Sequence, residues 1–127
     1  MIVGMTSAVI QGGPFVTLDV DIWIDLPSRQ YMRVINICHQ LGASLLGQCL
    51  VSINDVMVNF LYEVHGLKTF RTEYRKARWC QWQGEEVAVL PLDRLVASKE
   101  FVGRDKDLAV LPTLKKFMRS SRAAEEK

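Results

Sequence analysis

The sequence predicts one α/β (α+β) domain in which a short mixed or mostly antiparallel sheet is flanked by helices. The chain has 127 residues, of which 49% are hydrophobic and 24% charged, as in a soluble globular domain with its own core. Stretches with the two-residue period of strands and stretches with the helical period both occur. They do not alternate regularly, which disfavours a doubly wound parallel sheet.

The first half of the chain contains most of the predicted strands. Apolar and small residues at 1–10 indicate a short strand that turns into a helix, and the glycines and proline at 11–14 end it. Residues 16–24 alternate between polar and apolar side chains, several of them β-branched, which is a strand pattern. The elements expected next are a helix from Ser28, a favourable N-cap, to about Leu41, and strands at 49–53 and 56–64 joined at Asn54-Asp55.

The second half is predicted to be mainly helical. The expected elements are a helix at 68–79, a hairpin whose strands flank Gln83-Gly84, and helices at 91–101 and 105–119 separated by Gly103. This organisation amounts to a single domain over 1–119, followed by a small, charged and flexible tail over 120–127.

Several features favour a cytoplasmic protein without a membrane partner. The sequence contains no run of about 18 apolar residues that could cross a membrane. Its first residues lack the basic start of a secretory signal peptide. The three cysteines, Cys38, Cys49 and Cys80, match no zinc spacing, so we interpret them as free thiols of a reducing compartment.

Asp19-Val20-Asp21 is the most informative stretch of the sequence. Side chains alternate along a strand, so Asp19 and Asp21 share one face, about 7 Å apart at the backbone. Two carboxylates so placed repel each other unless a cation lies between them, and oxygen ligands suit Mg²⁺ or Mn²⁺. Phosphoryl or nucleotidyl transfer is the chemistry typical of such a pair. The alternative is a polar sheet face with both aspartates in water.

The aspartate pair belongs to a longer motif. Gly4 and the small residues after it open the first predicted helix, and Gly12-Gly13 and Thr17 precede the pair. In this order and spacing the sequence resembles the minimal nucleotidyltransferase superfamily, in particular the small bacterial proteins related to nucleotidyltransferase toxins of toxin–antitoxin systems. The resemblance implies a nucleotidyltransferase-like fold. It also implies that Gly4 lets the backbone approach a nucleoside triphosphate and that Asp19 and Asp21 hold Mg²⁺ or Mn²⁺. Thr17 has the threonine position of the motif, or is simply a β-branched strand residue.

A second stretch extends the resemblance. Lys99 lies on a predicted helix, and Arg104, Lys106 and Asp107 open the next one, as in these families. The resemblance implies that Lys99 and Lys106 approach the phosphates and that Asp107 lies near the metal or orients a basic residue. The alternative for Asp107 is an acid in the first turn of a helix, where the helix dipole favours it.

Together the two stretches imply Mg²⁺-dependent transfer of a nucleoside monophosphate from an NTP to a hydroxyl of RNA or protein. The resemblance places this reaction in a module of the toxin–antitoxin type. The partners that it implies are the NTP, an RNA or protein acceptor, and an antitoxin. A second copy of the chain that covers the sheet is a further expected partner, because relatives usually have a helix before the first strand and this sequence begins at that strand.

Three residues depart from the family pattern. Active members carry a third carboxylate on a later strand, where this chain has Asn59. An amide can bind a cation but cannot act as a general base, and the loss of such a base lowers a rate by about 10²–10⁴-fold. Met5 stands beside Gly4 in place of a second glycine, and Phe15 replaces the usual arginine. The alternative function is therefore a catalytically degenerate module that binds a nucleotide or a partner.

The stretch from Tyr74 to Trp82 interleaves aromatic and basic side chains. Such a pattern can stack on bases and contact phosphates, as in proteins that bind single strands. The alternative is the end of a helix with its charges outward and its tryptophans packed inward. If the protein modifies RNA, this stretch is where we expect the acceptor to dock.

Overall fold

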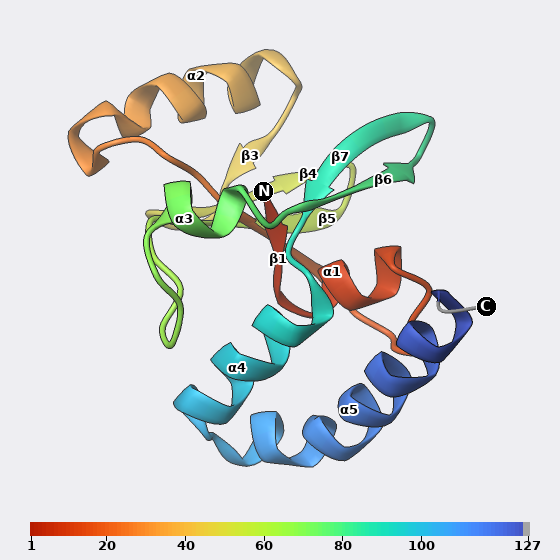
Figure 1. Ribbon diagram of the computed structural model, residues 1–127. Helices are drawn as coiled ribbons and strands as arrows, with labels where there is room; N and C mark the ends of the chain where they lie inside the picture. Colours follow the sequence, from red (N-terminus) through yellow and green to blue (C-terminus); the bar gives the residue numbers. More distant parts are fainter. Residues whose placement is uncertain (126–127) are drawn as a thin grey trace.

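A seven-stranded sheet forms the middle layer of the computed structural model, which describes residues 1–125 (Figure 1). The strands are β1 (Ile2–Val3), β2 (Asp19–Trp23), β3 (Ser44–Leu45), β4 (Leu50–Ile53), β5 (Val56–Leu61), β6 (Arg78–Trp82) and β7 (Glu85–Val89). Their order across the sheet is β3-β4-β5-β2-β1-β7-β6. β1 pairs with β7 and β2 with β5 in parallel, and the other neighbours are antiparallel. The prediction of an α/β fold with a mixed sheet is confirmed.

Helices cover both faces of this sheet. They are α1 (Gly4–Ile10), α2 (Tyr31–Gln40), α3 (Phe70–Tyr74), α4 (Leu92–Val102) and α5 (Asp105–Glu125), with a short 3-10 helix, η1 (Ser28–Gln30), before α2. In Figure 1, α2 lies above the sheet, whereas α1, α4 and α5 lie below it. None of the helices within residues 1–125 combines the length and the apolar character that a membrane crossing requires.

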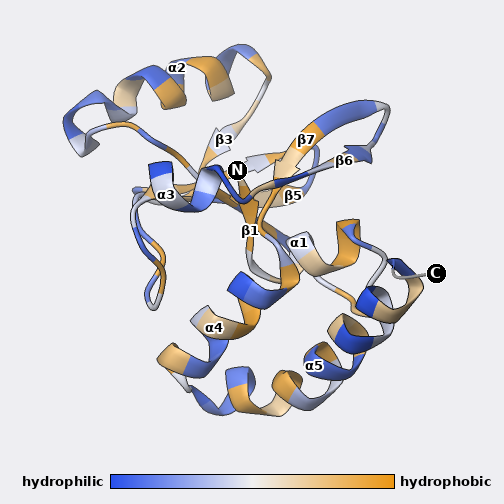
Figure 2. Cartoon of the chain, viewed as in Figure 1, coloured by the Kyte–Doolittle hydropathy of each residue, from blue (hydrophilic) through white to orange (hydrophobic). Residues whose placement is uncertain are grey.

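Each face of the sheet has its own hydrophobic core. The core beside α1, α4 and α5 contains Trp23 of β2. The core beside α2 is lined by Val20 and Ile22 of the same strand and by Ile24, which follows it. The alternation expected for β2 is therefore confirmed. Figure 2 shows the central β1 in the orange of hydrophobic residues. Val3, at the end of this apolar strand, is paired with Asp21 of β2.

Several boundaries differ from the predictions. β2 begins at Asp19 because Val16 and Leu18, which are 94% and 85% exposed, lie outside the sheet. The helix predicted at 68–79 is limited to α3, because the chain from Arg78 onward pairs with β7. The two-residue β3 has no counterpart in the predictions. Both predicted turns are present: Asn54, Asp55, Gln83 and Gly84 all have positive φ, as tight hairpin turns require.

The last helix is longer than predicted. α5 runs to Glu125, so residues 120–125, which were predicted to form a flexible tail, are the last residues of this helix. Arg78 of β6 forms an ion pair with Glu125 at 2.6 Å, which ties the end of α5 to the sheet. The rest of the predicted tail, 126–127, lies outside the described residues.

Candidate functional site

Gly4 and Asp21 form the floor of the site. Val3 at the end of β1 is paired in register with Asp21 of β2, so the first residue of α1 starts directly beside this carboxylate. Gly4 has a φ of +66°, and a Cβ atom there would lie 2.6 Å from Asp21 Oδ2. A side chain at Gly4 would therefore be strained and would displace the carboxylate. The structure gives this glycine a role beside Asp21; its contact with a nucleotide stays a prediction.

The neighbour of Asp21 on the other side is Asn59. The parallel pairing of β2 with β5 aligns Asp19 with Met57 and Asp21 with Asn59. Asp55, the other acid nearby in the sequence, is an exposed residue of the β4–β5 turn. The residue of β5 in register with Asp21 is thus an amide, at the position where the resemblance predicted it.

The negative charge of the Asp21 carboxylate is only partly offset by the surrounding chain. Burial raises the pKa of Asp21 above its ordinary value, and the charge of Asp19 adds to the rise. Hydrogen bonding to the Asn59 side chain and the charges of Lys99 and Lys106 oppose this rise in pKa. Within residues 1–125, Asp21 forms no ion pair with a basic side chain. A bound cation would remove the repulsion between the two aspartates.

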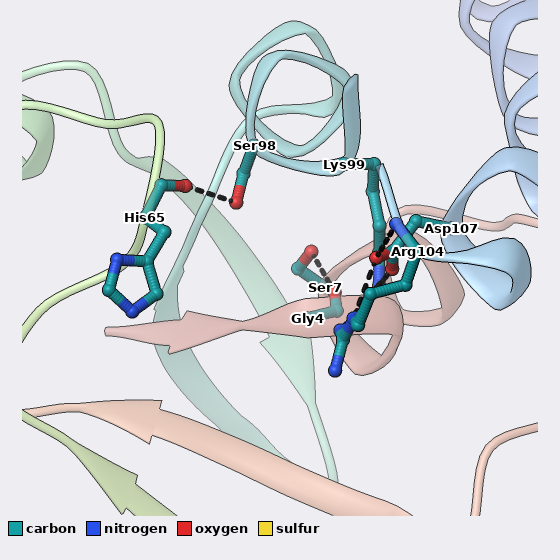
Figure 3. A network of polar contacts seen from close by, with 7 residues as sticks. All are labelled: Gly4, Ser7, His65, Ser98, Lys99, Arg104 and Asp107. Carbon is teal, nitrogen blue, oxygen red and sulfur yellow. Dashed lines mark hydrogen bonds and ion pairs between the residues drawn. The ribbon is translucent and has the colours of Figure 1, made fainter. Parts of the chain in front are cut away.

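Opposite this floor, the wall of the site consists of Lys99 and Arg104, both of which contact Asp107. The Asp107 side chain is fully buried, and Lys99 Nζ lies 3.1 Å from its Oδ1. Arg104 donates from Nε to Oδ2 at 2.8 Å and from its backbone N–H to the same oxygen at 3.1 Å. Figure 3 shows the three side chains meeting between α4 and α5, above Gly4. The Arg104 and Lys99 contacts hold the pKa of Asp107 down to about 2, although burial opposes them.

Two adjoining cavities lie between floor and wall. The first, of about 230 Å³, reaches Gly4 and Asp107, and the second, of about 360 Å³, reaches Thr17, Asp19 and Lys106. The residues that line both are Asp21, Lys99 and Arg104. The site is therefore a continuous surface with carboxylates on one side and cations on the other.

The structure brings the predicted site residues to one place, although they come from four separate segments. Those that line the cavities are Gly4, Thr17, Asp19, Asp21, Lys99, Lys106 and Asp107, and Asn59 adjoins Asp21 in the sheet. Of the three interpretations of Asp107, its contacts with Lys99 and Arg104 favour the one in which it orients basic residues. Thr17 donates to the backbone oxygen of Asp19 at 3.2 Å, so it shapes the start of β2.

Sequence reasoning assigned no role to Arg104, which lines both cavities. A signal was present, because Arg104 and Asp107 are three residues apart at the start of a helix and can meet there. Met5 and Phe15, two of the departures from the family pattern, pack against the core beside α1, α4 and α5 and also line the second cavity. Their bulk serves the core and narrows that cavity.

The donor set fits Mg²⁺ or Mn²⁺ bound with few protein ligands. Within residues 1–125 no group of three or more His, Cys, Asp or Glu residues could hold a metal. Asp19, Asp21 and the amide of Asn59 offer oxygen ligands only. Mg²⁺ in nucleotide enzymes is bound by one or two carboxylates and completes its shell with water and substrate phosphates. The residues present match this mode of binding and do not match a dedicated protein cage.

No protein-family model, curated protein or solved structure matches this chain. The resemblance to nucleotidyltransferases therefore rests on the two motif stretches. Both stretches contribute side chains to the cavities described above. The geometry of these residues carries the functional argument.

Proposed function

We propose that this protein is a Mg²⁺-dependent nucleotidyltransferase that transfers a nucleoside monophosphate from an NTP to a hydroxyl group. The observation that carries the proposal is the placement of opposite charges across one cavity. Asp21, without an ion-pair partner in residues 1–125, faces Lys99 and Arg104, which are held in position from behind by Asp107. A triphosphate with its metal ion matches both sides of this arrangement at once.

Each side has a distinct task in this proposal. Lys99 has two N–H donors left after its contact with Asp107, and Arg104 likewise has N–H groups that remain available for phosphate oxygens. Asp19 and Asp21 would hold the metal, which when bound supplies charge neutralisation at the reacting phosphates. The acceptor oxygen attacks the α-phosphorus, the bond to the bridging oxygen breaks, and pyrophosphate leaves. The acceptor proton goes to solvent, because Asn59 cannot take it.

A second candidate function is nucleotide binding without transfer. The observation that favours it is Asn59, which lies in register with Asp21 at the position of the family's third carboxylate. Met5 and Phe15 point to the same conclusion because they reduce the space in the second cavity. In this alternative the bound nucleotide stabilises the fold or a partner contact, with an antitoxin-type protein or a second copy of the chain as partner.

The test of the nucleotide site is thermal stabilisation by each of the four NTPs with Mg²⁺ or Mn²⁺. A ligand at 100 times its Kd adds about 2.7 kcal/mol to the free energy of unfolding. We expect a metal-dependent shift of Tm that disappears in Asp19→Asn/Asp21→Asn. The matched control is Asp93→Asn/Asp105→Asn, two acids outside the cavities. An unchanged Tm with every nucleotide would rule out both candidate functions.

The substitution Asn59→Asp separates transfer from binding alone. If the site is catalytic, a third carboxylate raises the rate of label transfer from an α-labelled NTP by about 10²-fold or more. If the site only binds, transfer stays at background while the Tm shift is kept. Asp55→Asn is the control, because Asp55 lies in the exposed β4–β5 turn. The three free cysteines agree with the reducing cytoplasm in which we place this activity.

A further inference from the structure

A row of aromatic side chains leads from the core to the surface at the β6 edge of the sheet. Trp23 meets Phe70 edge-on at 5.5 Å between ring centroids, and Phe70 stacks on Tyr74 at 5.2 Å. Tyr74 in turn meets Trp79 of β6 at 6.0 Å. Exposure rises along the row from 2% at Trp23 to 38% at Tyr74 and 56% at Trp79. The outer two rings therefore have faces or edges that no protein group covers.

The segment that carries this row is basic on its exposed side. Residues 68–78 contain five Lys and Arg residues and one acid, Glu73. Glu73 is fully buried and receives two hydrogen bonds from Arg94 of α4, at 2.9 and 3.0 Å, while Lys76 Nζ lies further away, at 3.9 Å from its Oε1. Arg71 and Arg75 are exposed and form no ion pair with any other residue of 1–125. Arg78 is paired with Glu125, so the positive charge that the described acids leave without an ion pair on this segment includes that of Arg71 and Arg75.

We propose that the α3–β6 surface, defined by Tyr74, Trp79, Arg71, Arg75 and Lys76, binds single-stranded RNA. Exposed aromatic rings between basic side chains offer stacking for bases and charge for phosphates, which is the combination that single-strand binding uses. RNA presents unstacked bases in its loops and ends, whereas most DNA is a duplex with its bases already stacked. A protein partner fits less well, because the uncompensated charge matches a phosphate backbone.

The ends of this surface limit where a strand can run. Glu85 and Glu86 lie opposite the last residues of β6, so the hairpin tip is acidic and repels phosphates. At the other end, Trp23 and Phe70 line a cavity of about 570 Å³. That cavity shares Glu63, Val64 and His65 with the first cavity of the candidate site. RNA binding by this surface does not depend on the proposed function. Only the idea that the bound strand is also the acceptor rests on that function.

Fluorescence anisotropy with a labelled single-stranded RNA of mixed sequence tests the surface in the full chain. We expect Trp79→Ala to weaken binding roughly 5- to 150-fold, the range for the loss of one stacked base. Leu45→Ala removes an exposed apolar side chain from the opposite edge of the sheet and should leave binding unchanged. Circular dichroism of each variant establishes that it is folded.

A second experiment tests the role of charge with two double variants, each of which removes two positive charges. Arg75→Ala/Lys76→Ala should weaken binding and lower the slope of log K against log salt by about 1.4, from about 0.7 for each phosphate contact. Arg29→Ala/Arg33→Ala, on η1 and α2, should change neither. Asp19→Asn/Asp21→Asn should bind RNA normally, so failure of the nucleotide site and failure of this surface are distinguishable.

Four results would overturn the proposal. They are the absence of RNA binding by the wild-type chain, unchanged binding by folded Trp79→Ala, equal weakening by the two charge variants, and equally tight binding of a duplex RNA. Equal affinity for single-stranded DNA of the same sequence would overturn the assignment to RNA.

Discussion

Asp21 and Asp107 line the same cavity, yet the protein treats these two carboxylates in opposite ways. Asp107 is fully buried between α4 and α5 and is bound by Lys99 and Arg104, which hold its pKa at about 2. Asp21 on β2 is only partly buried and has Asp19 rather than a cation on its own strand, so its pKa is raised. Burial opposes the charge of both groups; the presence or absence of direct cation contacts decides the direction.

This difference indicates which carboxylate supports the structure and which one faces a ligand. The charge of Asp107 is satisfied by the protein itself, so its contribution is present in the free chain. The charge of Asp21 costs free energy in the free chain, and that cost is removed only when a cation arrives. A buried acid close to a cavity is therefore not by itself a ligand. The four predictions that follow test this difference.

The largest effect is expected from Asp107→Asn. Removal of the charge leaves Lys99, which is only 18% exposed, without its partner. Loss of one member of a buried ion pair costs about 3 kcal/mol or more. Urea unfolding at pH 7 measures this cost. Asp105→Asn, an exposed acid in the same first turn of α5, should cost less than about 1 kcal/mol; equal losses would show that the buried contacts contribute little.

The acid side of the stability profile gives a second test. Because the pKa of Asp107 is lowered to about 2 from an ordinary value of 3.8, its contribution to stability is fully present above about pH 4. That contribution is lost as pH falls from about 4 towards 2. The difference in unfolding free energy between wild type and Asp107→Asn should therefore shrink across this window. A difference that stays constant down to pH 2 would contradict the lowered pKa.

Gly4→Ala tests how tightly the floor of the site is packed. The new Cβ would lie 2.6 Å from Asp21 Oδ2, and the residue would keep a φ of +66°. We expect a loss of about 1–2 kcal/mol from the backbone conformation, together with a displaced carboxylate. In Gly4→Ala/Asp21→Ala the steric part of the loss is relieved, so the two effects should not add. Chemical denaturation of the two single variants and the double variant measures this coupling. Strict additivity would show that the contact is absent.

The smallest effect, and one of opposite sign, is expected from Asp21→Asn. A raised pKa means that the fold disfavours the ionised carboxylate, so the penalty is present at neutral pH and disappears as pH falls below the ordinary value. Asp21→Asn should thus stabilise the metal-free protein at pH 7, by less than about 1 kcal/mol. Thermal unfolding with a chelator present measures the gain. Destabilisation would mean that a protein group already compensates Asp21.

The sequence predicted the fold wherever a local pattern specified the structure. The alternation around Val20 and Ile22 identified the two faces of β2, because burial on one face requires that period. The helix expected after Lys68 ended early, since pairing of Arg78 and its neighbours with β7 overrides a helical pattern. The two residues of β3 are too few to show any period. Strand pairings between distant segments, such as that of β1 with β7, could not be predicted either, because a local pattern does not name the partner strand.

The candidate site was predictable in composition and less so in geometry. The shared face of Asp19 and Asp21 follows from strand period alone. The burial of Asp107 does not, because an acid in the first turn of a helix is usually exposed, and only the packing of α4 against α5 encloses this one. The role of Arg104 depends on the same packing. The sequence motif names the residues, but tertiary packing decides which of them are bound to one another.

Helix α4 holds both of the buried acids described here. Arg94 in its first turn binds Glu73 of α3, and Lys99 binds Asp107 of α5, five residues or about 7.5 Å further along the helix. The same helix therefore connects the α3–β6 surface to the basic side of the cavity. If both proposed ligands bind and either of them shifts α4, thermodynamic linkage requires RNA to change nucleotide affinity by the same factor as nucleotide changes RNA affinity.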